Sequence, residues 1–231
     1  MDGDPLDNPA WLALSGPHRH LAIVEGAVRR YRPDIALFSG FDRVTPGMIA
    51  TLPSLVPEGG VVGVLRSEPI EVPSALDAVV ALPLRQMVGG TGLLPDTGVA
   101  EMVPLGDADV PDMLDLVHLT EPGPFARRTI EMGSYFGIRL QGKLAAMAGE
   151  RMRLDGFTEV SAVCTHPDFR RRGYAAALVR HVANGISARG ERPFLHVRVE
   201  NAAAISTYEA LGFSIRRTLS LQVLRRASVT P

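Results

Sequence analysis

Hydrophobic and polar residues alternate most regularly in the second half of the chain. Residues 135–140, 143–154 and 157–165 have the two-residue period typical of strands. The pairs Gln141-Gly142 and Asp155-Gly156 separate them, and such pairs favour tight hairpin turns. The pattern therefore predicts three consecutive antiparallel strands.

A second pattern, with apolar residues three and four apart, predicts helices. Leu178, Val179, Val182 and Ile186 form one apolar stripe within residues 174–190. Asp107 precedes a similar stripe at Val110, Met113, Leu114 and Val117. We also expect helices over residues 125–133 and 201–213, strands over 99–105 and 193–199, and extended segments over 214–226.

The first half is less regular. We expect helices over residues 17–31 and 45–55, and strands over 34–38, 60–66 and 76–84. Residues 88–99 contain Gly89, Gly90, Gly92, Gly98 and Pro95, a composition typical of a linker. We therefore place a boundary near residue 95, between a smaller α/β domain (1–95) and a second domain (96–231).

Composition narrows the function classes. The formal net charge is -1 and 46% of the 231 residues are hydrophobic, so no global positive field attracts nucleic acid or an anionic membrane. The single cysteine, Cys164, excludes an intrachain disulfide and fits a reducing compartment. No apolar run approaches the roughly 20 residues of a membrane span. We expect a cytoplasmic protein without a metal site.

The stretch "HPDFRRRGYA", residues 166–175, lies between a predicted strand and a predicted helix. N–H groups in the first turn of a helix lack intrahelical partners, and the helix dipole adds positive potential. Gly173 allows close approach of the backbone, and Ala175 is small. The stretch therefore predicts a phosphate-binding turn.

The spacing Arg170-x-x-Gly173-x-Ala175 resembles the acyl-CoA pyrophosphate turn of the GNAT superfamily of N-acyltransferases. The preceding hairpin strands follow the order of that family, and "LGF" at residues 211–213 closes the last helix as it does there. Asn201, Ala204 and Tyr208 lie three and four apart, so one helical face can look back at a cofactor. The resemblance covers roughly residues 99–226.

The resemblance implies an α/β (α+β) fold with a mixed, mostly antiparallel sheet, opened into a V by splaying of residues 157–165 and 193–199. Acetyl-CoA is the implied acyl donor, with its pantetheine in the V. Backbone groups of Val163 and Thr165 would bind the pantetheine, and a backbone N–H near Val163 or Cys164 would meet the oxyanion. The other implied cofactor-binding residues are Arg170, Arg171, Arg172, Gly173, Tyr174, Ala175, Asn201, Ala204 and Tyr208.

The implied reaction is direct transfer of an acetyl group to an amine in a ternary complex. The amine must lose a proton before it attacks, and Glu159, eleven residues before Arg170, resembles the general base of some family members. Tyr208 resembles the tyrosine that protonates the leaving thiolate. Surface exposure of Glu159, core packing of Tyr208 and simple N-capping by Asn201 remain the structural alternatives.

The acceptor side is less defined. The resemblance points to Phe125, Tyr135, Glu150 and Met152 as substrate-binding residues. A small-molecule amine or an amino acid is the expected acceptor, with a protein N-terminus or lysine as an alternative. Residues 1–95 are expected to act as a degenerate partner domain that covers the acceptor side, and a homodimer is compatible with the sequence.

Two other classes remain open at this point. The first is a CoA-binding regulatory module without catalysis. The second is nucleic-acid binding through the arginines, which the net charge and the lack of interleaved aromatic residues disfavour. Cys164 and His166 share a strand face, but Pro167 follows at once and no orienting group is evident, so we do not expect a nucleophilic dyad.

Overall fold

The structure is a computed structural model that describes residues 4–90, 92, 94–95 and 98–227. Its described strands form one sheet of eleven, in the order β1-β2-β3-β4-β11-β5-β10-β9-β8-β7-β6. Only the pairs β3–β4 and β9–β10 are parallel, and the other neighbours are antiparallel. The expected mixed, mostly antiparallel fold is confirmed. Among the described residues, no helix is long and apolar enough to cross a membrane.

The first half differs from the predicted pattern. Its elements are η1 (Pro5–Asp7), α1 (Pro9–Ser15), η2 (Arg19–Leu21), β1 (Ala22–Glu25), β2 (Val28–Tyr31), β3 (Phe38–Phe41), α2 (Pro46–Leu55), β4 (Val62–Arg66) and β5 (Leu76–Val88). The helix expected over residues 17–31 is wrong, because Gly26 turns the chain at φ 55° and a hairpin forms. The strand expected over residues 34–38 is also misplaced, since β3 begins only at Phe38. Helix α1 was not predicted.

The second half follows the predicted pattern closely. Its elements are β6 (Val103–Leu105), η3 (Asp107–Asp109), α3 (Val110–Thr120), η4 (Thr129–Met132), β7 (Tyr135–Leu140), β8 (Lys143–Leu154), β9 (Phe157–Thr165), η5 (Pro167–Phe169), α4 (Tyr174–Ala188), β10 (Arg192–Arg198), α5 (Ala202–Ala210) and β11 (Ser214–Arg226). The three hairpin strands have the predicted bounds. The helix expected over residues 125–133 is only the short 3-10 turn η4.

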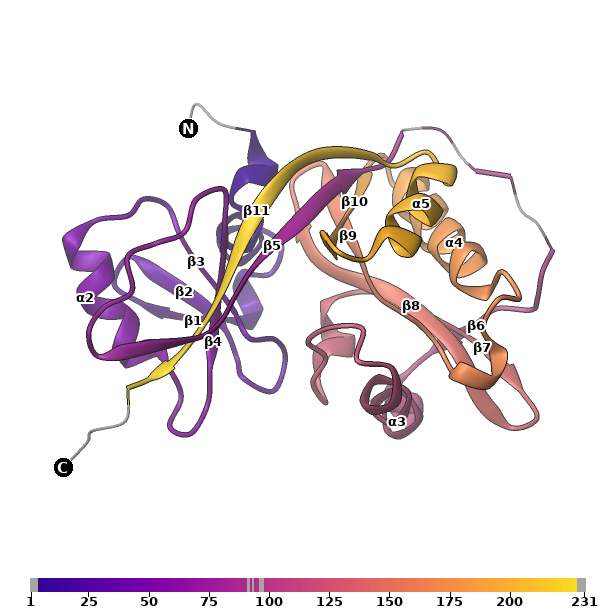
Figure 1. Ribbon diagram of the computed structural model, residues 1–231, viewed down its shortest axis with the longest axis horizontal. Coiled ribbons are helices and arrows are strands. Elements are labelled where there is room, and N and C mark those ends of the chain that lie inside the picture. Colours follow the sequence, from indigo (N-terminus) through magenta and orange to yellow (C-terminus); the bar gives the residue numbers. More distant parts are fainter. Residues whose placement is uncertain (1–3, 91, 93, 96–97, 228–231) are drawn as a thin grey trace.

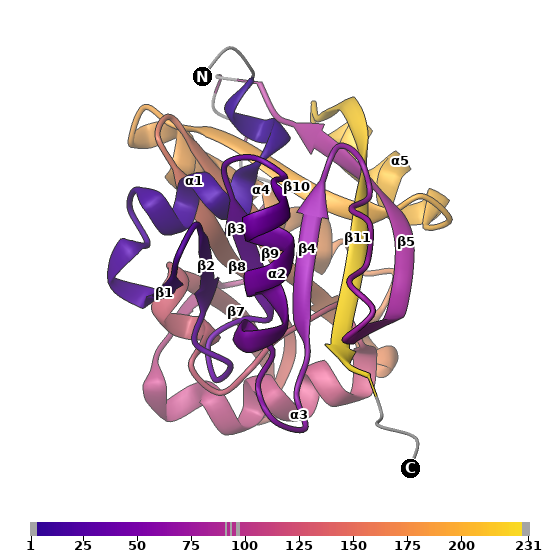
Figure 2. The ribbon, with the colours of Figure 1, turned by 90° about the vertical axis from the view of Figure 1, so that its left-hand side faces the viewer.

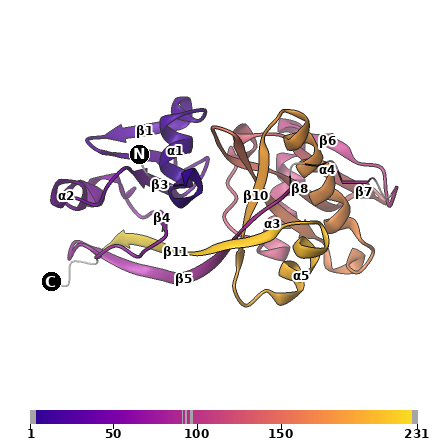
Figure 3. The same ribbon diagram turned by 90° about the horizontal axis from the view of Figure 1, so that it is seen from above.

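The sheet order is nearly symmetric about its centre. A parallel pair with a helix between its strands, β3–α2–β4, lies on one side, and β9–α4–β10 lies on the other. The long strands β5 and β11 pair with each other and run from one half into the other (Figures 1 and 3). Figure 2 shows β4, β11 and β5 side by side. Strands from both sides of residue 95 share this sheet. The domain boundary near residue 95 stays a prediction.

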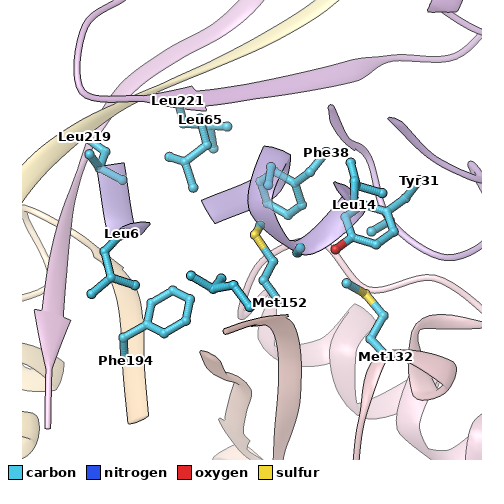
Figure 4. Close-up of a cluster of buried hydrophobic side chains, with 14 of the residues drawn as sticks. Leu6, Leu14, Tyr31, Phe38, Leu65, Met132, Met152, Phe194, Leu219 and Leu221 are labelled. Atoms are coloured by element: carbon cyan, nitrogen blue, oxygen red, sulfur yellow. The ribbon is translucent and has the colours of Figure 1, made fainter. Parts of the chain in front are cut away.

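Apolar side chains bury both faces of the sheet. Helices α4 and α5 pack on one face of the second half through residues such as Leu178 and Ile205, and α3 packs on the other face through Met113 and Val117. A further cluster joins the two halves and includes Leu14, Phe38, Met152 and Phe194 (Figure 4). The halves are therefore connected by a shared hydrophobic core.

Candidate active site

Strands β9 and β10 form a V. They pair in parallel only at Phe157↔Arg192, Thr158↔Pro193 and Glu159↔Phe194. Beyond Glu159, β9 continues to Thr165 along β8, while β10 turns to pair with β5. The splay expected from the sequence is confirmed. The facing edges of β9 and β10 thus leave backbone donors and acceptors available to a strand-like ligand.

A β-bulge shapes the β9 arm of the V. The pairing with β8 shifts between Met147↔Cys164 and Gly149↔Ser161, so β9 holds one extra residue there. Ala162 has a φ of 53°, a left-handed conformation that costs a non-glycine residue about 1–2 kcal/mol. Strain of this kind often marks a functional position because the surrounding fold must hold it in place.

The predicted phosphate-binding turn follows β9. Arg171 and Gly173 both have positive φ, at 62° and 78°, and α4 begins at Tyr174. The first hydrogen bond of α4 runs from the Ala177 N–H to the carbonyl oxygen of Gly173. The amides of Tyr174, Ala175 and Ala176 therefore lie in the first helical turn. The N-cap Gly173 has no side chain with which to cap them. This end of α4 is therefore suited to bind an anion.

The three arginines have different surroundings. Arg170 Nε donates to Thr165 O at 3.3 Å and so joins the turn to the end of β9. Arg172 lies over the Phe169 ring, with 5.4 Å between its Cζ and the ring centroid, and Arg171 is exposed. This arrangement fits the ordering role expected of Arg170.

Helix α5 carries the other cofactor-side candidates. The Asn201 Oδ1 accepts from the Ala204 N–H at 3.1 Å, so Asn201 is the N-cap of the helix. Tyr208 is partly buried against the α4-side cluster, with its ring centroid 6.2 Å from that of Phe213. Burial raises the pKa of Tyr208 to about 12, and the phenol is protonated at neutral pH.

The surroundings of Glu159 do not support the general-base role expected from the sequence. Its side chain is fully buried and receives two hydrogen bonds from Arg151, at 2.9 and 2.6 Å. A third contact joins Glu159 Oε1 to His196 Nδ1 at 2.7 Å. Burial alone would raise the pKa of Glu159, but Arg151 and His196 hold it well below its ordinary value. Such a carboxylate is a weak proton acceptor.

Two of the four predicted acceptor residues lie together. The rings of Phe125 and Tyr135 meet edge to face with 5.6 Å between centroids. The Tyr135 ring lies against Gly149, where an added Cβ would come within 2.2 Å of it. The Tyr135 hydroxyl is buried and has no hydrogen-bond partner in the described structure. An orphaned buried hydroxyl is unfavourable unless a ligand satisfies it.

The other two differ from each other. Met152 is buried in the cluster between the halves, apart from the Phe125–Tyr135 pair. Glu150 lies beside the start of β7, where its Oε2 accepts from the Ser134 N–H at 3.4 Å, and its Oε1 accepts from Arg189 Nη2 at 2.9 Å. The structure therefore brings Glu150, but not Met152, close to Tyr135. Cys164 is buried as expected, and burial raises its thiol pKa to about 11, which makes it a poor nucleophile.

Sequence reasoning missed three polar residues beside the V: Arg151, His196 and Gln86. Gln86 and the His196 and Arg151 side chains are all less than one-tenth exposed. His196 interrupts an apolar stretch, and that was the available signal at this position. Arg151 and Gln86 directly follow charged residues, Glu150 and Arg85, so the pattern gave no such signal there. Their partners, however, are 8 to 130 residues away in the chain, and no local pattern could have identified them.

Comparisons with known proteins agree with this geometry. A family model described as FR47-like protein matches residues 135–221. The [Ribosomal protein bS18]-alanine N-acetyltransferase of Escherichia coli (strain K12) is 37% identical over 91 residues, which are 39% of this chain. The match spans 61% of that relative's length.

Solved structures extend the likeness to the whole chain. A GCN5-related N-acetyltransferase from Kribbella flavida shares the fold, with a TM-score of 0.60 at 17% identity over 94% of this chain and 96% of its own. A structure assigned to the GNAT family, from Novosphingobium aromaticivorans, is 40% identical, with a TM-score of 0.89 over 98% of this chain and 100% of its own. This chain therefore belongs to the GNAT family of acetyltransferases.

Proposed function

We propose that this protein transfers an acetyl group from acetyl-CoA to the primary amine of a small molecule or amino acid. The observation that carries the proposal is the open V between β9 and β10, followed at once by the uncapped start of α4. A V with unpaired strand edges suits the amides of pantetheine. The helix start suits the pyrophosphate, so the two features match one extended ligand.

The proposed contacts follow from this arrangement. Pantetheine pairs with the backbone of Val163 and Thr165 on the open edge of β9, and the amides of residues 171–175 bind the pyrophosphate. The bulge at Ala162 turns a backbone N–H of Val163 or Cys164 toward the thioester oxygen, where it stabilises the oxyanion. Ala204 and Tyr208 line the cofactor from α5.

The reaction needs one nitrogen–carbon bond to form and one carbon–sulfur bond to break. The neutral amine attacks the thioester carbon, and the tetrahedral intermediate expels the CoA thiolate. Tyr208, whose pKa is about 12, donates a hydrogen bond to this thiolate. It keeps its proton, because the thiol of CoA is a stronger acid than the Tyr208 phenol. We assign no base role to Glu159. The amine loses its proton to water.

A small acceptor is favoured by the way the loop before η4 is tied to the first half. Arg128 Nη1 donates to Asp34 Oδ2 at 3.0 Å, and the Arg128 N–H donates to Asp34 O at 2.8 Å. Thr129 Oγ1 also donates to Ile35 O. These contacts hold the loop beside Phe125 and limit the approach of a large substrate. The unpartnered Tyr135 hydroxyl is the proposed contact for the acceptor.

A second candidate acceptor is the N-terminal amine of a protein. It is favoured by the 37% identity to an enzyme named for acetylating an alanine of ribosomal protein bS18. An α-amino group has a pKa near 8, so a useful fraction is already neutral at physiological pH.

An acceptor panel with acetyl-CoA separates these candidates. Release of free thiol is measured with small amines, amino acids and peptides that begin with alanine. Turnover of a small amine or amino acid above that of any peptide supports the main proposal. Faster turnover of a peptide supports the second candidate, and CoA binding without turnover of any amine would indicate a non-catalytic module.

A further inference from the structure

A chain of polar side chains, buried except at its outer member Arg216, crosses the sheet where the V begins. Its members, called here the vertex network, are Arg151 on β8, Glu159 on β9, His196 on β10, Gln86 on β5 and Arg216 on β11. Glu159 and Gln86 are fully buried, and the His196 side chain is 2% exposed. Polar groups buried this deeply are costly unless each donor and acceptor finds a partner.

The hydrogen bonds define one arrangement of protons. Arg216 Nη1 can only donate, so its partner on Gln86, 2.8 Å away, is the amide oxygen. The Gln86 amide nitrogen then donates to Leu6 O at 2.8 Å and faces His196 Nε2 at 3.1 Å. His196 Nε2 must therefore accept, and Nδ1 carries the proton toward Glu159. The imidazole is held from both sides, by Gln86 and by Glu159.

Two β-bulges turn the outer arginines into this network. The β8–β9 register shifts between Glu150↔Val160 and Arg153↔Thr158, which leaves an extra residue on β8 beside Arg151. The β11–β5 register shifts between Ile215 and Arg217, so Arg216 is itself unpaired. A bulge redirects a side chain out of the regular alternation. Both bulges lie at members of the vertex network, one at Arg151 and one at Arg216.

The network lies where backbone pairing ends. Glu159↔Phe194 is the last pair between β9 and β10, and His196 is two residues beyond it on β10. Past this point, the Glu159–His196 hydrogen bond joins the two arms in place of the backbone ladder. Gln86, directly paired with His196 in register, supports the imidazole from behind.

We propose that Glu159 and His196 are positioning residues, which fix the separation of β9 and β10 at the start of the V and thereby preorganise the acyl-CoA cleft. This inference rests on the proposed function, because it assigns the cofactor to the V. A hydrogen bond between rigid, fully buried groups holds the two arms at one spacing, and a preformed cleft binds more tightly than one that must be ordered.

The test compares two substitutions of His196. His196→Asn keeps a donor near the position of Nδ1, whereas His196→Leu removes it. We expect His196→Leu to raise the Kd for CoA about tenfold by calorimetry and His196→Asn to restore binding to within about threefold. His20→Leu, at an exposed histidine outside the network, is the matched control and should bind as the unaltered protein does.

The outcomes separate this inference from the function itself. No CoA binding by the unaltered protein overturns the proposed function. Normal CoA binding by His196→Leu, with or without a lower kcat, overturns the positioning role alone. If His196→Leu does not fold, ¹⁵N NMR of the unaltered protein decides: Nδ1 protonated and Nε2 unprotonated at pH 7 supports the network, and the opposite tautomer overturns it.

A pH profile separates a positioning role of Glu159 from a base role. For Glu159→Gln, a positioning role predicts a weaker Kd for CoA with an unchanged shape of the kcat/KM profile. Loss of an ionisation from that profile would instead make Glu159 the base and contradict the inference.

Discussion

At the scale of single residues, Gly173 is the most constrained position of the turn. Its φ of 78° lies in the region that side chains rarely adopt, although an added Cβ would meet only Val99, at 3.8 Å. Backbone conformation, rather than lack of space, therefore accounts for glycine here. The neighbouring Arg171 adopts a similar φ, so two residues of the turn are left-handed.

We expect Gly173→Val to weaken CoA binding at least 100-fold, because the new side chain would change the backbone that presents the amides. Exchange of both Arg171 and Arg172 for glutamine should weaken it only a few fold. Calorimetry measures both. Gly190→Val is the matched control, since Gly190 has the same φ of 78° at the far end of α4 and should leave CoA affinity unchanged. Equal losses from the turn variants would mean that the guanidinium charges dominate.

Tyr208 provides a second residue-scale prediction. Tyr208→Phe removes only the hydroxyl and keeps the ring against Phe213. We expect kcat to fall by about 10- to 100-fold while the KM for acetyl-CoA changes little, since the hydrogen bond forms only as the thiolate leaves. Steady-state kinetics test this. An unchanged kcat would remove Tyr208 from the mechanism.

At the scale of elements, the start of α5 depends on one cap. Asn201→Ala removes the acceptor for the Ala204 N–H and should lower the free energy of unfolding by about 1 kcal/mol, whereas Asn201→Asp should restore it. Chemical denaturation measures the difference. If Asn201→Asp restores stability yet still weakens CoA binding, the side chain also contacts the cofactor.

The hairpin of the first half supplies a pH-dependent contact. His18 Nδ1 lies 2.9 Å from the Tyr31 hydroxyl, and burial, followed by the nearby His20, lowers the pKa of His18 to about 4. Below its ordinary pKa of 6.5, the unfolded chain takes up the proton first. We expect stability to fall by about 3 kcal/mol as pH drops from 6.5 to 4.

His18→Gln should flatten this part of the stability profile, and His20→Gln, at an exposed position, should leave most of it in place. Urea unfolding followed across the pH range provides the comparison. A slope that persists in His18→Gln would assign the effect to another group.

At the scale of the whole molecule, the near-symmetric sheet raises the question of a second cofactor site. Strands β3 and β4, which α2 connects, pair at only two positions. Strands β9 and β10, which α4 connects, pair at three. Helix α1, however, packs directly on β3, where a Cβ added to Gly40 would come within 2.4 Å of the backbone nitrogen of Trp11. Thr45 caps α2, and Pro46 removes one of its free N–H groups.

The chain should therefore bind one acetyl-CoA. Calorimetric titration is expected to give a stoichiometry of about one per chain, and Gly173→Val should abolish that single event. A second binding event that survives Gly173→Val would place a cofactor in the first half. It would contradict the view that α1 occupies the place on β3 where a second cofactor would bind.

Features that depend on near neighbours in the chain could be predicted from the sequence. The hairpins of β7, β8 and β9 follow from alternation and glycine turns, and the phosphate-binding turn follows from Gly173 between a strand and a helix. Short apolar stretches in the first half were ambiguous, so residues 17–31 were predicted as a helix although β1 and β2 form there.

The surroundings of Glu159 and Gln86, by contrast, come from long-range strand pairing. Their partners come from strands that the fold brings together, with Gln86 meeting His196 across 110 residues and Arg216 across 130. The two bulges that place Arg151 and Arg216 have no signature in the alternation pattern. A carboxylate that the sequence suggested as a base is thus a sealed ion pair, because proton affinity depends on burial and partners that only long-range pairing creates.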